Sequence, residues 1–572
     1  MVKENQVNLA TLFLVYSMSL LFALATYHVF ALAGMMAGIS ISVGHIFVLL
    51  VLFVLSNLIL AKRYIANSRV EYLVTSYLIF ALSVAGALMI ARAFTDFGGD
   101  SQTAHLPGII HLANGWNPIW DPWWFDVRKE VASNYLLLNS AGEVGAGEID
   151  YPSAAGKFAY FLMAAIYAAT GNIEDGKLIN WLLIICLFTY AYGALRTAGV
   201  SNRLSWLASA IVSLNPVIIY QSKTVYVDAY MSVFLSIFIL SVFHLSRANH
   251  SLVRIAAVLS LALIISTKLS GLYYGIFFGG VSLGLLYFFH RSKLPNKKTA
   301  VAIACLITFV TIHPYATNIK TYGNPFYPAT LVNKQIFVSG LSKWFHEAGR
   351  IDGFLMSVFS KSNRNPDTPE LKFPFKVTKD ELLAFQGPDA RIGGGGPLFG
   401  GAVILSLMML LWYLVRYRQY RAEDAVLIVA VLVSALIPQI TWWMRFTPHV
   451  WLIPILLVIT VLPQTRDKIT RLLGLGTASV MLLNSIIIAS VDHRYQSRMN
   501  SQYLGQIAEI QQLEQPIRVS LSNFRAGKFR FPGMGVKYVP DPLCAESPDR
   551  MPIVLSENTV CLPPGSGVKK NW

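Results

Sequence analysis

Two acids and a histidine stand where a long apolar stretch of the sequence gives way to polar residues. Asp96, Asp100 and His105 all fall within 93–107, directly after the apolar run 71–92. A carboxylate placed at bilayer depth costs about 2.5–3.5 kcal/mol, so acids at such a boundary indicate chemistry on a lipid-borne substrate. The alternative is a polar cap where a helix leaves the membrane.

Further charged residues recur at the ends of later apolar runs. Lys223 and Asp228 flank one turn, Lys268 stands in a very short turn, and Arg445 follows another run. Lysine and arginine at headgroup level suit a phosphate, and an acid suits activation of a hydroxyl or amine nucleophile. Asp100 and Asp228 could also share a divalent metal ion bridging to a phosphate. Any one of these cations could instead only snorkel to lipid headgroups.

The composition places these residues in a polytopic membrane protein. Of the 572 residues 55% are hydrophobic and 13% are charged, and the mean hydropathy is +0.52. Apolar runs of ~20 residues, each long enough to cross a bilayer, recur from end to end. The first run, 7–37, lacks a basic leader and a cleavage site, which predicts a retained span. The net charge of +16 is spread through short loops, which argues against a nucleic-acid partner.

The basic loops predict the topology, because cytoplasmic loops carry an excess of Lys and Arg. The strongly basic loops lie near 62–69, 196–203, 247–254, 291–298, 416–421 and 466–471. Thirteen spans place all of them inside: 8–36, 43–61, 71–92, 177–195, 204–221, 227–246, 252–267, 271–290, 298–316, 399–415, 424–442, 447–463 and 472–491. We therefore expect an all-α polytopic membrane protein, with its N-terminus in the cytoplasm and its C-terminus on the other side of the membrane.

Three parts follow from this topology. Residues 1–70 form two N-terminal spans, and 71–491 form the main membrane module with two long connections outside the cytoplasm, 94–176 and 318–398. Residues 492–572 form a small C-terminal domain, also outside the cytoplasm. The stretch 152–171 is apolar enough to span, but a span there would invert every later loop. It is predicted to lie on or dip into the outer face.

The four cysteines divide between these parts. Cys544 and Cys561 both lie in the tail, where an extracytoplasmic setting and a domain of ~80 residues favour a disulfide. Cys186 and Cys305 lie in apolar spans and are expected to pack there. No phosphate-binding, dinucleotide-binding or zinc-spacing motif is present, and no internal repeat indicates an inverted-repeat transporter.

Several short motifs resemble GT-C-fold glycosyltransferases. The sequence Asp-Ser-Gln-Thr-Ala-His-Leu-Pro at 100–107 resembles their first extracytoplasmic loop. The sequence Tyr-Pro-Ser-Ala-Ala-Gly-Lys at 151–157 resembles the Pro-headed helix of protein O-mannosyltransferases and aminoarabinose transferases, and 215–228 is similar to their second acid-bearing loop. Other similar elements are Thr267-Lys268, Asn-Pro-Phe-Tyr-Pro at 324–328, and Arg445-Phe446.

The sequence departs from that superfamily in two ways. Two extra spans precede the acidic loop, and no second acid directly adjoins Asp100. The second departure leaves open both the need for a metal and the choice between Asp96 and Asp100.

The resemblance implies a GT-C-like enzyme of a bacterial inner membrane, with the two long connections and the small C-terminal domain in the periplasm. It would transfer a sugar, with inversion, from a polyprenyl-phosphate donor to a glycan, lipid or protein acceptor at the periplasmic face. Asp100 would be the base, preferred because it follows Gly98-Gly99, with Asp96 in reserve and Asp228 in support. The expected substrate-binding residues are His105, Lys223, Lys268, Tyr327 and Arg445.

Two other functions compete with this one. The first is a transporter or flippase for a lipid-linked or anionic solute, and the second is a non-catalytic component of an envelope-polysaccharide machine. Spans interrupted at mid-depth would favour transport.

Overall fold

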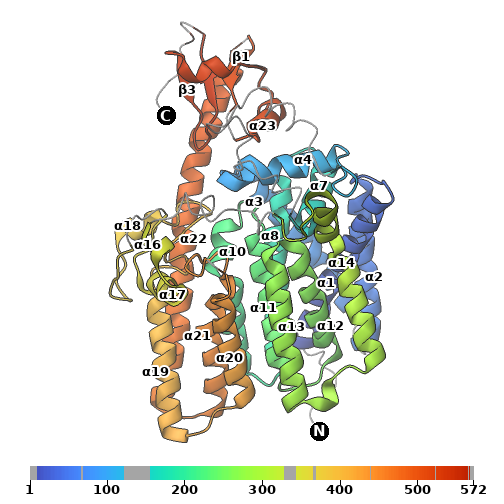
Figure 1. The fold of residues 1–572 in the computed structure, drawn as a ribbon, viewed down its shortest axis with the longest axis vertical. Helices are drawn as coiled ribbons and strands as arrows, with labels where there is room; N and C mark the ends of the chain where they lie inside the picture. Colours follow the sequence, from blue (N-terminus) through green and yellow to red (C-terminus); the bar gives the residue numbers. More distant parts are fainter. Residues whose placement is uncertain are drawn as a thin grey trace.

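The computed structural model describes residues 9–65, 69–121, 155–327, 343–364, 369–438, 440–513, 515–521, 524–563 and 566. The described part is mainly helical, and most of its long helices run side by side in one bundle (Figure 1). Nine of its helices are long and apolar enough to cross a membrane. They are α1 (Leu9–Met36), α2 (Gly44–Tyr64), α3 (Arg69–Ala93), α8 (Leu178–Thr197), α11 (Asp228–Leu245), α13 (Ser270–Phe289), α14 (Lys297–Tyr322), α19 (Phe399–Tyr417) and α22 (Lys468–Gln511). The expectation of a multi-pass helical membrane protein is confirmed.

The other four expected spans correspond to shorter or broken helices. These are α12 (Ser251–Thr267), α20 (Ala422–Ala435), α21 (Leu452–Val461) and the pair α9 (Asn202–Ser213) and α10 (Pro216–Gln221). The break in the expected span 204–221 has a local cause. The side chain of Asn215 accepts a hydrogen bond of 3.0 Å from the backbone of Val217 and so begins a new helix at Pro216.

Helix α7 (Phe158–Thr170) lies within the stretch predicted to lie on the outer face. Its 13 residues span only about 20 Å, less than the ~30 Å hydrocarbon core of a bilayer. The helix is buried from Phe158 to Ile166, and the hydroxyl of Tyr27 donates to the carbonyl of Phe161 at 2.9 Å. This helix is therefore packed against protein, as expected for a segment that does not span.

The N-terminus and the C-terminal domain lie at opposite ends of the bundle (Figure 1). Helix α22 connects the bundle to that domain. Its 44 residues extend about 66 Å, roughly twice the hydrocarbon thickness, so its second half projects beyond the bundle. The domain boundary predicted at 492 therefore falls inside a continuous helix.

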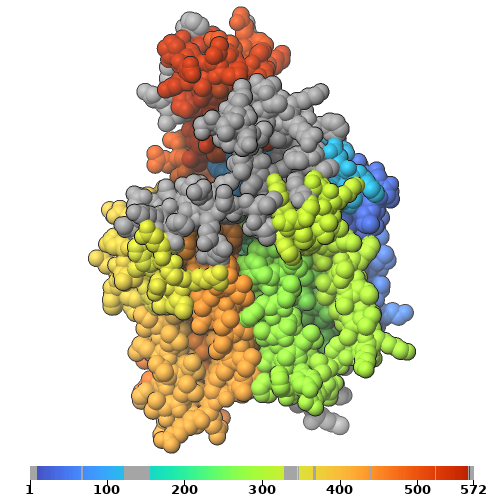
Figure 2. Space-filling view, in the orientation of Figure 1, coloured from blue at the N-terminus to red at the C-terminus, as the bar shows by residue number. Residues whose placement is uncertain are grey.

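The described residues of the C-terminal domain, within 515–563, form a small sheet with one α-helix and one short 3₁₀-helix, Pro542–Glu546. The strands are β1 (Ile517–Ser520), β2 (Tyr538–Pro540), β3 (Arg550–Pro552) and β4 (Thr559–Cys561), in the spatial order β2-β1-β4-β3. Strand β1 pairs in parallel with β2 and antiparallel with β4. The α-helix is α23 (Gly527–Gly533). In the space-filling view the domain, coloured red, stands beyond one end of the bundle (Figure 2).

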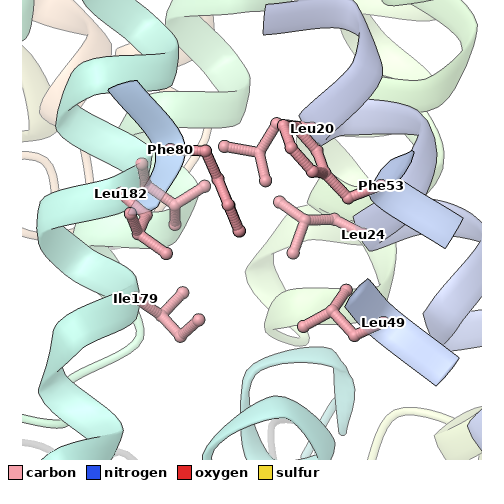
Figure 3. Close-up of a pocket in the computed structure, with 8 residues that line it drawn as sticks. Leu20, Leu24, Leu49, Phe53, Phe80, Ile179 and Leu182 are labelled. Carbon is pink, nitrogen blue, oxygen red and sulfur yellow. The ribbon is translucent and has the colours of Figure 1, made fainter. Parts of the chain in front are cut away.

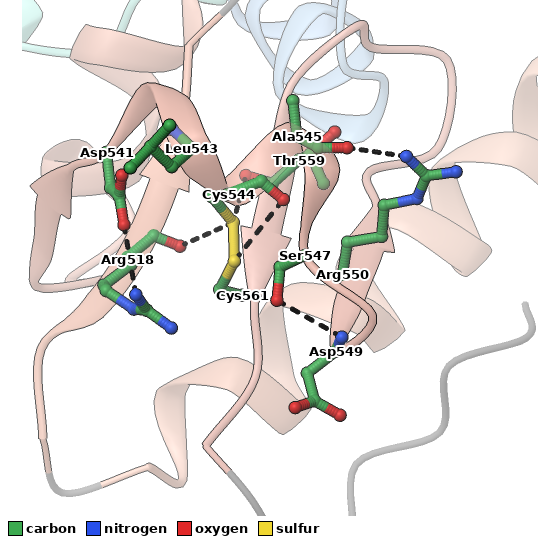
Figure 4. Close-up of a disulfide and its surroundings, with 10 residues drawn as sticks. All are labelled: Arg518, Asp541, Leu543, Cys544, Ala545, Ser547, Asp549, Arg550, Thr559 and Cys561. Atoms are coloured by element: carbon green, nitrogen blue, oxygen red, sulfur yellow. Dashed lines mark hydrogen bonds and ion pairs between the residues drawn. A yellow bond between two sulfur atoms is a disulfide. The ribbon is translucent and has the colours of Figure 1, made fainter.

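Two features tie this small domain together. Its apolar core is shared with α22, whose Tyr503 and Ile507 pack with Val519 and Phe531. A disulfide joins Cys544 to Cys561, with their Cα atoms 5.5 Å apart, and so links the turn after β2 to β4 (Figure 4). The pairing is the one expected from the sequence. The other two cysteines are free. Cys186 is buried in α8, as expected, whereas Cys305 is exposed on α14 and does not pack inside the protein as expected.

A small cavity lies between α1, α2, α3 and α8 (Figure 3). Its volume is about 20 Å³, enough for one water molecule. The lining is entirely apolar, with Leu24, Phe53, Phe80 and Leu182 among its residues. A water there would find no polar partner, so the cavity is a packing gap and not a ligand site.

Candidate functional site

The loop that carries Asp100 is shaped by Asp96. One carboxylate oxygen of Asp96 accepts a hydrogen bond from the backbone of Gly98 at 2.9 Å, and the other accepts from the backbone of Val225 at 2.7 Å. A Cβ atom at Gly98 would lie 2.6 Å from the ring of Tyr226, so only glycine fits this approach. Asp96 thus ties the loop after α3 to the turn before α11.

Arg445 is the centre of a group of charges beneath this loop. Its Nη2 lies 2.7 Å from Oδ2 of Asp100, and its Nε lies 2.9 Å from Oδ2 of Asp228. Its Nη1 lies 3.7 Å from Oδ1 of Asp389. The Nζ of Lys268 lies 2.6 Å from Oδ1 of Asp228. These five residues are called the Arg445 cluster, and they come from five separate segments of the chain.

Both carboxylate oxygens of Asp228 are occupied by neighbouring side chains. Besides Arg445 and Lys268 it accepts a hydrogen bond from Nε2 of Gln221 at 3.2 Å, and its side chain is 2% exposed. It stands at the first residue of α11, where an acid is favoured by the helix dipole. With both oxygens occupied, Asp228 suits the orientation of the two cations better than the abstraction of a proton.

Asp100 has the opposite character. Its side chain is 51% exposed, although protein surrounds it on most sides, and Oδ1 has no partner among the described residues. Its backbone N–H donates to the hydroxyl of Tyr226 at 3.0 Å. Burial by itself would raise the pKa of Asp100, but the guanidinium of Arg445 outweighs it and holds the pKa below the usual value. An ionised carboxylate with a free oxygen can accept a proton from a substrate.

Aromatic rings enclose the cations of the cluster. The guanidinium of Arg445 lies 5.1 Å from the ring centroids of both Tyr226 and Trp443, and the Nζ of Lys268 lies 4.3 Å from that of Phe446. Such contacts stabilise a partly desolvated cation. They also fix the side chains of Arg445 and Lys268 in place.

Asp389 is a member of the cluster that the sequence analysis did not identify. Its Oδ1 accepts a hydrogen bond of 2.8 Å from the indole of Trp443, and burial raises the pKa of its carboxyl. It lies in the 318–398 connection, two residues after Gly387 and shortly before the Gly393–Gly396 run. The position of this acid beside a glycine run was the signal available in the sequence.

The remaining predicted site residues lie outside the cluster. Asp96 is fully buried, and burial raises its pKa to about 6. Lys223 forms an ion pair with Asp492 of α22. The Nδ1 of His105 lies 2.5 Å from the hydroxyl of Tyr160, and burial lowers the pKa of this histidine to about 4. Tyr327 lies in the turn after α14.

A metal ion shared by Asp100 and Asp228 does not fit this arrangement. Arg445 bridges the two carboxylates and supplies the positive charge between them. Among the described residues no group of three or more His, Cys, Asp or Glu side chains is placed to hold a metal. Within the cluster, Arg445 and Lys268 are the cations that an anionic ligand could meet.

A family model matches residues 152–324 of the chain, and its description is dolichyl-phosphate-mannose-protein mannosyltransferase. The chain thus resembles GT-C-fold glycosyltransferases, as expected. The matched stretch includes Asp228 and Lys268 but neither Asp100 nor Arg445. A comparison with curated proteins finds no match.

Two solved structures are also similar to this chain. One is ArnT from Cupriavidus metallidurans bound to undecaprenyl phosphate, with 12% identity, a TM-score of 0.40 and coverage of 81% of this chain and 85% of that one. The other is ArnT from the same organism in the apo state, with 12% identity, a TM-score of 0.39 and coverage of 83% and 86%.

Proposed function

We propose that this membrane protein transfers a sugar from a polyprenyl-phosphate donor to an acceptor hydroxyl or amine. The observation that carries the proposal is the half-exposed carboxylate of Asp100, held ionised by Arg445 beside the Asp228–Lys268 pair. The description of the matching family, which names a dolichyl-phosphate-linked sugar, supports this class of donor.

The proposed reaction uses the two ends of the cluster differently. Oδ1 of Asp100 takes the proton of the acceptor, whose oxygen or nitrogen attacks the anomeric carbon. The bond from that carbon to the phosphate oxygen breaks, and the leaving polyprenyl phosphate keeps the electron pair. Arg445 and Lys268 stabilise its negative charge.

An inverting reaction is part of the proposal. Contacts run from Asp100 through Arg445 and Asp228 to Lys268, so the base and the ammonium group stand at opposite ends of this series. An inverting displacement needs the base and the departing phosphate on opposite faces of the sugar. A sugar lying along the series, with its phosphate towards Lys268, meets that requirement.

The proposed site faces away from the cytoplasm, and reporter fusions test this orientation. Fusions after Asn324 and Ser501 are expected to be active only with a reporter that works in the periplasm, because both positions lie at the end of the bundle opposite the basic loops. A fusion after Arg418, in a basic loop, is the matched control and should show the reverse. Cytoplasmic reporter activity at both Asn324 and Ser501 would contradict the proposed orientation.

An assay of the purified protein in liposomes distinguishes a transferase from a transporter. We expect it to convert a polyprenyl-phosphate sugar into polyprenyl phosphate and a glycosylated acceptor, both detected by mass spectrometry. The acceptor is sought by comparing glycolipids, surface polysaccharide and envelope proteins of wild-type and deletion strains. Movement of the labelled lipid across the bilayer without any new covalent product would support a flippase and contradict the proposal.

A further inference from the structure

A buried arginine of the C-terminal domain reaches the loop that carries Asp100. Arg530 of α23 is 4% exposed. Its Nη2 lies 2.8 Å from Oε1 of Glu174 and donates to the backbone carbonyl of Asp96 at 2.7 Å. Its Nη1 donates to Oε1 of Gln102 at 3.3 Å. One guanidinium from the far end of the chain thus contacts the loop on both sides of Asp100.

Glu174 links this arginine to the membrane bundle. It lies just before α8, and its Oε2 accepts hydrogen bonds from the Nζ of Lys177 at 2.6 Å and from the backbone of Asp96 at 3.0 Å. Burial would raise the pKa of Glu174, but Arg530 and Lys177 outweigh it and keep the pKa low. The carboxylate is therefore ionised where it meets the arginine.

Further contacts fasten the loop before Asp100 to α22. The side chain of Asn500 accepts a hydrogen bond from the backbone of Thr95 at 2.9 Å and donates to the carbonyl of Ala93 at 3.0 Å. The ring of Phe97 packs in the apolar core of the C-terminal domain, 5.6 Å from that of Tyr503.

The segment after Asp100 is fastened to the C-terminal domain as well. The backbone carbonyl of Gln102 accepts a hydrogen bond from the backbone of Ala526 at 3.0 Å, and its side chain donates to the carbonyl of Leu555 at 2.9 Å. Between these anchors lie Gly98 and Gly99, which constrain the backbone least. The contacts on both sides therefore restrict the position of Asp100.

We propose that the C-terminal domain is part of the active-site scaffold, and that Arg530 is a positioning residue that keeps Asp100 in place beside Arg445. The inference rests on the proposed transfer reaction. A displacement of about 1 Å at a reacting group can cost about a hundredfold in rate. A loop held by glycines alone would allow such a displacement, and Arg530 prevents it.

The test compares Arg530→Ala with Arg518→Ala in the full-length protein. Arg518 belongs to the same domain but is exposed and pairs with Asp541, away from the loop. For Arg530→Ala we expect kcat to fall about ten- to a hundredfold while the KM for the donor stays near wild type, because Arg445 and Lys268 still hold the phosphate. Arg518→Ala should change neither, and Arg530→Lys should restore part of kcat by keeping the ion pair with Glu174.

Hydrogen–deuterium exchange of residues 94–105 supplies a readout that is independent of activity. Arg530→Ala should increase exchange there, whereas Arg518→Ala should not. The milder variant Asn500→Ala removes two loop contacts without leaving a buried charge, and it should show the same two effects to a smaller degree. This variant keeps the test valid if Arg530→Ala destabilises the domain as a whole.

Two results would overturn the inference: wild-type kcat in both Arg530→Ala and Asn500→Ala, or a lowered kcat with unchanged exchange at 94–105. Failure of the proposed function is a separate result, because it would be observed as an absence of sugar transfer by the wild-type protein.

Discussion

Replacing Asp100 with asparagine is expected to reduce sugar transfer by about 10²- to 10⁴-fold, the usual contribution of a general base. The substitution keeps the shape of the side chain and removes the proton acceptor. Donor binding should persist, because Arg445 and Lys268 remain paired with Asp228. Single-turnover kinetics with saturating donor, together with a separate donor-binding measurement, test both expectations.

Two other aspartates serve as comparisons for Asp100→Asn. Asp352 is an exposed acid in the 318–398 connection, and Asp352→Asn should behave like wild type. In the wild type both oxygens of Asp96 accept hydrogen bonds from backbone N–H groups. In Asp96→Asn the amide NH₂ would face one of these N–H groups, so we expect the loop to loosen and the activity to fall indirectly. Wild-type turnover in Asp100→Asn with an inactive but folded Asp96→Asn would reverse the roles assigned here. Full activity in both would contradict the proposed mechanism.

Replacing Arg445 with glutamine is expected to weaken donor binding about ten- to a hundredfold, the worth of a charge-assisted contact of roughly 1.5–3 kcal/mol. Arg445→Lys should not restore binding fully, because lysine cannot contact Asp100 and Asp228 simultaneously with a planar fork. Lys268→Ala is the companion variant, since Lys268 touches the same carboxylate from the other side. Donor titrations of protein in nanodiscs measure the effect.

The Arg445→Gln variant should also change the pH dependence of transfer. In the wild type Arg445 keeps the pKa of Asp100 low, so the base stays ionised throughout the neutral range. Without the guanidinium, burial raises that pKa, and activity should be lost at a higher pH on acidification. Unchanged donor binding in both Arg445→Gln and Lys268→Ala would indicate that these cations only snorkel to lipid headgroups.

Much of the membrane module could be predicted from the sequence. Apolar runs of bilayer length must form helices, because an unpaired backbone group is too costly in lipid. Nine expected spans accordingly appear as long helices, and 152–171 contains the short α7. Among the four remaining spans, the one expected at 204–221 is broken, because the side chain of Asn215 caps a new helix inside the apolar run.

The sequence also indicated where to look for the site. Charged side chains at the ends of spans are costly near lipid. Their positions in the sequence therefore indicated a functional site before any contact between them was known. Asp100, Asp228, Lys268 and Arg445 were all identified in this way, and the structure places them in one cluster.

Only the tertiary structure decided how these charges pair. Asp96 and Asp100 look alike in the sequence. In the structure Asp96 is fully buried and bonded to backbone, whereas Oδ1 of Asp100 meets no partner within the part of the chain that the structure describes. Lys223 pairs with Asp492 instead of joining the cluster, because the second half of α22 continues as helix beyond its expected span.

Asp389 and Arg530 illustrate why the sequence could not supply the rest. Asp389 meets Arg445 and Arg530 meets Glu174 only after separate segments have packed together. Hydropathy and local motifs determine which segments cross the membrane and where charges emerge from it. The partners of those charges depend on contacts between segments far apart in the chain, and packing alone sets those contacts.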